Sequence, residues 1–228
     1  MMRVFAFDAD DTLWDCQSHF EAVQERFYAL LARYGDEKAL YAELYLTETA
    51  NMSLLGFGTK AFTLSLVETA VRVSGGAVSG EVIGELIRMG KALLSMPTPP
   101  LPGVEDTLRA LGGYRLVVFT KGELLDQQGK LMRSGLAPFF ERVIIVSDKT
   151  EQEYLNLCEA LSIVPEELVM VGNSFRSDIA PAIAVGATAI HIPYHVSWQL
   201  EQADEFAHER IITLQTFSDL LTIIPRLA

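Results

Sequence analysis

Acidic residues crowd the end of an apolar run near the start of the chain. The hydrophobic segment 3–7 is followed by four aspartates within eight positions: Asp8, Asp10, Asp11 and Asp15. Like charges repel, and taking carboxylates out of water is costly, so a buried strand rarely ends this way by chance. Carboxylates at such a place can move protons or bind a cation.

Other apolar runs also end in polar residues. The run at 115–120 ends with Thr120, and the run at 142–147 is followed by Lys149. The run at 168–172 is followed by Asn173 and Asp178. Ligands of open parallel sheets bind beyond the carboxyl ends of the strands. Asp8 and Asp10 lie where the first run ends, so we expect them to point into the same crevice as these groups.

The apolar runs have the character of buried strands. They occupy residues 3–7, 115–120, 142–147, 168–172 and 187–192 and are nearly continuously apolar, as in a parallel sheet covered on both faces. Helical patterns alternate with the later runs. One spans 123–134 and stops at Gly135, and another spans 151–162 after a capping signal at Thr150. The chain from about residue 104 onward therefore predicts an α/β fold with a Rossmann-like, doubly wound parallel sheet.

Residues 16 to about 96 carry helical patterns alone. Apolar stripes at helical spacing lie within 20–31, 62–71 and 82–93, the last after Ser79 as the expected N-cap. The prolines of the segment 97–103 end this block, because proline cannot continue a helix. We therefore expect an α/β core domain of residues 1–14 and 101–228, and an inserted all-helical domain of residues 15–100.

Composition excludes several classes of protein. The net charge of −12 over 228 residues argues against nucleic acid as a partner. No apolar stretch approaches the ~20 residues that a membrane span needs, and the N-terminal apolar run is too short for a signal peptide. We expect a globular cytoplasmic protein without a membrane partner. The sequence carries no signal for an oligomeric state.

Several residues near the acidic cluster have structural interpretations. Asp11 and Asp15 are expected to bond the local backbone. The Trp14 side chain is expected to pack near the hinge to the helical insert and not to serve as a binding platform. Cys16 and Cys158 are expected to be buried free thiols. The four histidines show no metal-binding spacing.

Taken together, the motifs resemble those of the haloacid dehalogenase-like (HAD) superfamily of hydrolases. That pattern has Asp-x-Asp-x-Thr after the first strand, Thr or Ser after the second, Lys before a later helix and an acidic motif after the fourth. The matching segments here are DADDT (8–12), Thr120, Lys149 and GNSFRSD (172–178). The helical insert resembles the C1-type cap domain of this family, so the resemblance covers the whole chain.

The resemblance implies a role for each residue. Asp8 would be a nucleophile that forms an acyl-phosphate, and Asp10, on the same side of an extended segment, would protonate the leaving group and then activate water. Lys149 would neutralise Asp8 and the phosphoryl group, and the Thr120 hydroxyl would bind a phosphoryl oxygen. The implied phosphate-binding residues are Thr120, Lys121 and Lys149.

The resemblance also implies Mg²⁺ as cofactor. Its ligands would be the Asp8 side chain, the Asp10 backbone carbonyl, and Asn173 and Asp178 in the acidic motif. Many family members have Asp at the position of Asn173. An amide oxygen can ligate Mg²⁺ but brings no charge, so Asp178 could be the main acidic ligand.

The function predicted on this basis is Mg²⁺-dependent hydrolysis of a small phosphorylated metabolite by a phosphatase. Three alternatives remain open at this stage. A phosphomutase of the β-phosphoglucomutase type shares all four motifs. A metal-independent haloacid dehalogenase needs the nucleophile but not Asp10, and a catalytically silent HAD-fold binding module is supported only by Asn173.

Overall fold

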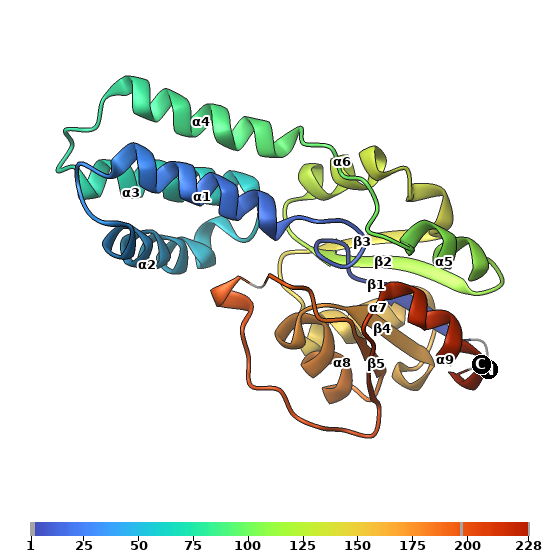
Figure 1. The fold of residues 1–228 in the computed structure, drawn as a ribbon. Coiled ribbons are helices and arrows are strands. Elements are labelled where there is room, and N and C mark those ends of the chain that lie inside the picture. Colours follow the sequence, from blue (N-terminus) through green and yellow to red (C-terminus); the bar gives the residue numbers. More distant parts are fainter. Residues whose placement is uncertain (1–2, 197, 228) are drawn as a thin grey trace. The chain divides into compact units, whose positions relative to one another are not determined.

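The computed structural model describes residues 3–196 and 198–227 and divides into two compact units (Figure 1). The first unit holds the described residues up to Gln17 and from Pro97 onward, and the second is Ser18–Met96. The sequence placed these divisions at 14/15 and 100/101.

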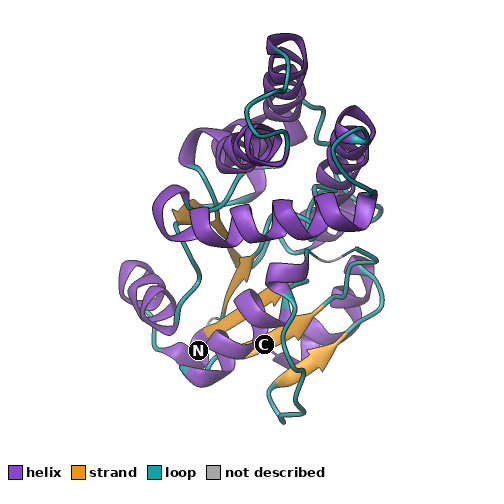
Figure 2. Cartoon of the chain, turned by 90° about the vertical axis from the view of Figure 1, so that its left-hand side faces the viewer, coloured by secondary structure: helices purple, strands orange, loops and turns teal. Residues whose placement is uncertain are grey.

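Six strands of the described chain form one parallel sheet, all within the first unit (Figure 2). The strands are β1 Val4–Phe7, β2 Arg115–Lys121, β3 Arg142–Val146, β4 Leu168–Gly172, β5 Thr188–His191 and β6 Ile211–Thr213. Their order is β3-β2-β1-β4-β5-β6, and neighbouring strands are parallel throughout. The chain winds outward from β1 to β3 and then crosses back to β4, so β1 lies between β2 and β4 at the point where the winding reverses. The predicted doubly wound sheet is confirmed.

Helices cover both faces of this sheet (Figure 1). They are α5 Val104–Ala110, α6 Leu124–Ser134, α7 Glu151–Leu161, α8 Ala180–Ala184 and α9 Leu220–Leu227. Side chains of β1 alternate between the two faces: Phe5 and Phe7 belong to the core under α5, α6 and α9, whereas Val4 and Ala6 belong to the core under α7 and α8. Burial on both faces explains why the strands read as continuous apolar runs.

The predicted ends of two helices are also confirmed. α6 stops at Gly135, whose φ of 74° is the left-handed conformation that glycine adopts without strain. α7 begins after Thr150, whose hydroxyl oxygen accepts a hydrogen bond from the Glu153 amide at 3.3 Å. The start of α7 matters for the candidate site, because Glu151 lies two residues after Lys149.

The second unit contains helices and no strands among its described residues. α1 Gln17–Leu31, which begins one residue before the unit, is followed by α2 Glu37–Leu55, α3 Thr59–Val73 and α4 Gly80–Leu94. The expected N-cap is confirmed, because the Ser79 hydroxyl accepts from the Val82 amide at 3.3 Å. α3 and α4 approach closely at Gly90, where a Cβ would lie 2.0 Å from Thr63 Oγ1. No helix in the described ranges is long and apolar enough to cross a membrane.

Candidate active site

Three neighbouring strands deliver polar residues to one edge of the sheet. Asp8 directly follows β1, Thr120 and Lys121 end β2, and Asn173 directly follows β4. The backbone amide of Asp8 still donates to the carbonyl of Val171 at 2.9 Å, which fixes the end of β1 against β4. The strand order thus places these groups at the winding reversal, where open α/β sheets bind ligands.

Lys149 joins two acids from different strand ends. Its ammonium group donates to Asp8 Oδ1 at 2.5 Å and to Asp178 Oδ1 at 2.6 Å. The side chains of Lys149 and Asp178 are each 1% exposed and that of Asp8 is 11% exposed. Three residues predicted for the site therefore form one buried charged cluster.

This cluster has more negative than positive charge. Burial raises the pKa of Asp8 from 3.8 to about 7, against the effect of Lys149 and with a further contribution from Asp178. Burial alone would lower the pKa of Lys149, but Asp178 and Asp8 outweigh it, so this pKa is raised and the ammonium stays charged. A second cation at this place would stabilise the carboxylates.

Neutral oxygens lie beside the same acids. The Thr12 hydroxyl is 3.3 Å from Asp8 Oδ2 and 3.2 Å from the amide oxygen of Asn173, so it links the two groups. Asp178 Oδ2 accepts from the backbone amide of Ser174 at 2.9 Å. Gly172 permits this arrangement, because a Cβ there would lie 2.2 Å from Asp178 Oδ2.

The available donors fit a hard cation. Two carboxylates and an amide, all oxygen donors, suit Mg²⁺. Across the described residues, no group of three or more His, Cys, Asp or Glu side chains could hold a metal ion. A metal bound here would therefore complete its coordination with neutral ligands such as the Asn173 amide, a backbone carbonyl and water.

Asp10 belongs to a separate cluster. Its carboxylate oxygens lie 2.9 and 3.0 Å from Lys130 Nζ, and Asp10 Oδ1 also accepts from Trp14 Nε1 at 2.7 Å. The Lys130 side chain is 3% exposed, and it also donates to Cys16 Sγ at 3.3 Å. Burial alone would raise the pKa of Asp10, but Lys130 and Trp14 together hold it below 3.8. Asp10 is thus a carboxylate in this structure.

Sequence reasoning missed two features of this second cluster. Trp14 is fully buried, as a packing residue is, but its indole also orients Asp10. Lys130 was not singled out at all. Its burial has no signal in the sequence, because the buried face of α6 is mainly polar and the apolar side chains of Leu124 and Met132 are exposed.

The end of β2 has partners of its own. Gln127 Nε2 donates to Thr120 Oγ1 at 2.7 Å, and the Thr120 hydroxyl in turn faces the carbonyl oxygen of Lys121 at 3.5 Å, a long and weak contact. Lys121 Nζ donates to Ser177 Oγ at 2.7 Å and pairs with Glu201. Gln127 and Glu201 were not anticipated from the sequence.

Two further expectations are confirmed. The Asp11 carboxylate accepts from the backbone amides of Cys16 and Gln17 at 2.8 and 3.0 Å, which suits a residue at a positive φ of 61°. Cys16 and Cys158 are buried free thiols.

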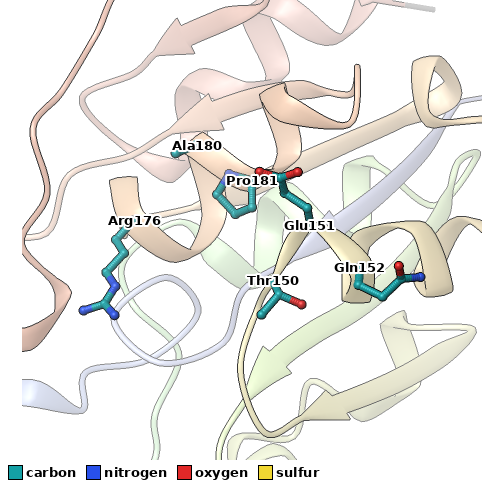
Figure 3. Close-up of a pocket in the computed structure, with 6 residues that line it drawn as sticks. All are labelled: Thr150, Glu151, Gln152, Arg176, Ala180 and Pro181. Carbon is teal, nitrogen blue, oxygen red and sulfur yellow. The ribbon is translucent and has the colours of Figure 1, made fainter.

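An open pocket is lined by sequence neighbours of the charged cluster and not by the cluster itself. Figure 3 shows the residues that line it, three at the start of α7 and three on the turn after β4 and on α8: Thr150, Glu151, Gln152, Arg176, Ala180 and Pro181. Thr150 directly follows Lys149, and Arg176 lies two residues before Asp178. None of the charged groups of the cluster lines the pocket.

Comparisons with known proteins point in one direction. Residues 2–186 match the family described as haloacid dehalogenase-like hydrolase. The chain is 32% identical over 209 residues to a glyceraldehyde 3-phosphate phosphatase of Methanothermobacter thermautotrophicus, covering 83% of this chain and 85% of that protein. It is 29% identical over 204 residues to a protein of the same name from Pyrococcus abyssi, covering 85% and 82%.

A solved structure resembles the whole chain. It is a haloacid dehalogenase-like family hydrolase from Xanthomonas campestris, with a TM-score of 0.90 and 30% sequence identity, and the match covers 99% of this chain and 91% of that one. Sequence motifs, strand order and these similarities agree. The protein therefore belongs to the haloacid dehalogenase-like hydrolases.

Proposed function

We propose that the protein is a Mg²⁺-dependent phosphatase that hydrolyses a small phosphorylated metabolite through an aspartyl-phosphate on Asp8. The observation that carries this proposal is the bridge from Lys149 to both Asp8 and Asp178. It places a buried cation against the proposed nucleophile, as the approach of a phosphate dianion requires.

In the first step, an Asp8 oxygen attacks phosphorus and the ester P–O bond breaks. The leaving oxygen takes a proton from Asp10, and Lys149 and the Thr120 proton stabilise charge on the phosphoryl oxygens. In the second step, water attacks the same phosphorus and gives its proton to Asp10. Inorganic phosphate leaves, and the Asp8 carboxylate is restored.

Asp10 must carry a proton for the first step only. The pair with Lys130 stabilises its carboxylate, which is the form that accepts the proton of water in the second step. A bound phosphate dianion brings negative charge near Asp10 and so favours the protonated form. Substrate binding would in this way prepare the acid.

Asp8, Asp178, Asn173 and the Asp10 backbone carbonyl would hold Mg²⁺. When bound, the ion supplies positive charge that offsets the repulsion between carboxylates and phosphate. The excess negative charge around Asp8 supports this assignment.

Glyceraldehyde 3-phosphate is the first substrate to test, because the similar proteins from M. thermautotrophicus and P. abyssi are named for its hydrolysis. The cytoplasmic location stays a prediction from the sequence.

The experiment compares phosphate release by the wild type, Asp8→Asn and Asp204→Asn, with and without Mg²⁺. Asp204 is an exposed acid outside the site and serves as the control. We expect the wild type and Asp204→Asn to release phosphate only with Mg²⁺, and Asp8→Asn to be inactive. Turnover by Asp8→Asn would overturn the proposal.

A further inference from the structure

An ion pair ties a long loop to the edge of the candidate site. Lys121 ends β2 beside Thr120, and Glu201 lies in the loop between β5 and β6. Their side chains are 15% and 13% exposed, so the pair is largely removed from solvent.

The Glu201 carboxylate also receives two hydroxyl groups. Ser174 Oγ and Ser177 Oγ each donate to Glu201 Oε2 at 2.7 Å, and Lys121 Nζ donates to Ser177 Oγ at the same distance. Burial alone would raise the pKa of Glu201, but Lys121 and the two serines hold it below 4.5. The group is therefore a carboxylate with hydrogen bonds to both oxygens.

Both serines lie beside the proposed metal ligands. Ser174 directly follows Asn173, and its backbone amide donates to Asp178 Oδ2 at 2.9 Å. Ser177 directly precedes Asp178, and its amide donates to Ser174 Oγ at 3.1 Å. The carboxylate of Glu201 thus holds the hydroxyls at both ends of the turn that presents these ligands.

Other residues of the loop also contact this turn. Arg176 Nη1 donates to the carbonyl oxygen of Leu200. The Phe206 ring meets Phe175 edge-on, with ring centroids 5.1 Å apart. The loop contacts every residue of the turn from Ser174 to Ser177.

We propose that Glu201 is a positioning residue that braces the turn carrying Asn173 and Asp178 and ties it to the end of β2, so that the ligands are held in place before metal binds. This inference rests on the proposed function of the site. In this inference Lys121 helps to hold the turn through Glu201 and Ser177, whereas the sequence predicts that Lys121 binds phosphate.

The test compares Glu201→Gln with Glu205→Gln, an exposed glutamate of the same loop. Binding of Mn²⁺ alone, as a probe for Mg²⁺, is measured on the metal-free proteins by electron paramagnetic resonance. We expect Glu201→Gln to weaken binding roughly 10-fold to 100-fold, the usual effect of losing a residue that orients metal ligands, and Glu205→Gln to leave it unchanged. Hydrogen exchange at the amides of residues 174–178 should be faster in Glu201→Gln without metal.

Kinetics separate positioning from a general loss of folded protein. We expect the half-saturating Mg²⁺ concentration for phosphatase activity to rise by the same factor, with kcat recovered at saturating Mg²⁺. A loss of folded protein would lower kcat and leave the half-saturating concentration unchanged. If Glu201→Gln does not fold, Ser174→Ala removes one of the two hydroxyl contacts and should weaken Mn²⁺ binding in the same direction.

Two results would overturn the inference. One is Mn²⁺ binding by Glu201→Gln equal to that of Glu205→Gln. The other is tighter binding of inorganic phosphate by Glu201→Gln, which would mean that Lys121 and the serines form an anion site that Glu201 occupies. If the wild type hydrolyses no phosphate ester, the proposed function is wrong. Metal binding and hydrogen exchange would still test whether Glu201 holds the turn in place.

Discussion

Two aspartates of the site are neutralised by different lysines. Asp8 shares Lys149 with Asp178, whereas Asp10 has Lys130 and an indole donor. One cation for two buried acids leaves the Asp8 group short of positive charge, and burial there raises the pKa of Asp8 to about 7. The pKa of Asp10 is lowered despite burial. The group around Asp8 is therefore the one that a metal cation would stabilise most.

This charge imbalance predicts how stability depends on pH. The Asp8 carboxyl binds a proton more tightly in the folded protein, with a pKa of about 7, than unfolded, with a pKa of 3.8. Its contribution to the free energy of unfolding therefore falls as the pH rises from about 4 to about 7. In chelator at about pH 8, we expect Asp8→Asn to be more stable than the wild type by up to about 4 kcal/mol, since the pKa rises from 3.8 to about 7 and each pKa unit corresponds to about 1.4 kcal/mol.

Urea unfolding with and without Mg²⁺ measures this difference. Added Mg²⁺ should stabilise the wild type more than Asp8→Asn, because the variant lacks one charged ligand. If the wild type were more stable than Asp8→Asn in chelator at this pH, there would be no excess of negative charge around Asp8.

Asp10→Asn tests the acid and base role. We expect kcat to fall by about 10² or more, the usual scale of general acid–base catalysis. The substitution also leaves the Lys130 ammonium buried without its carboxylate, which should cost about 2 kcal/mol or more of stability.

The double variant Asp10→Asn/Lys130→Met separates these effects. Removing both charges should restore much of the lost stability without restoring kcat, as chemical denaturation and steady-state kinetics would show. Full activity in Asp10→Asn would rule out its role as acid and base.

At the scale of elements, α3 and α4 of the second unit depend on a close approach. A Cβ at Gly90 would lie 2.0 Å from Thr63 Oγ1 and 2.8 Å from Thr63 Cβ, so Gly90→Ala should destabilise the protein by about 1–3 kcal/mol. Gly84 in the same helix has nothing within 4 Å of such a Cβ. Gly84→Ala should therefore stabilise by about 0.5–1 kcal/mol, because alanine favours the helix. Thermal unfolding should show a lower midpoint for Gly90→Ala and a higher midpoint for Gly84→Ala. Equal midpoint shifts would contradict the close packing at Gly90.

The elements that the sequence predicted are those with a regular pattern. The segments 123–134 and 151–162 become Leu124–Ser134 and Glu151–Leu161, because apolar spacing and caps are local signals. β6 was missed because Ile211–Thr213 is too short to give a run. Local patterns also place Asp8 and Lys149 at strand ends, where the structure joins them.

The unpredicted residues act through distant contacts. Lys130 meets Asp10 across 120 positions, and Glu201 meets Lys121 across 80. Neither pairing has a local pattern, since only the strand order brings these segments together. The buried face of α6 is mainly polar, so apolar spacing does not reveal the burial of Lys130, and Glu201 ends a 3-10 helix of three residues that is too short to give a pattern.

At the scale of the whole molecule, similarity to named phosphatases extends over most of the chain. The haloacid dehalogenase alternative predicts chloride release from a 2-haloacid without metal, and we expect none. Phosphatase and phosphomutase share the first step, in which Asp8 becomes phosphorylated. Whether Asp8 carries a phosphoryl group during turnover is therefore the property that matters most.

The most direct measurement is acid-quenched single turnover with Mg²⁺, followed by peptide mapping by mass spectrometry. We expect one phosphoryl group on the peptide that contains Asp8, formed before inorganic phosphate appears and absent in Asp8→Asn. Turnover in which this peptide never carries a phosphoryl group, or in which another residue carries it, would show that Asp8 is not the nucleophile.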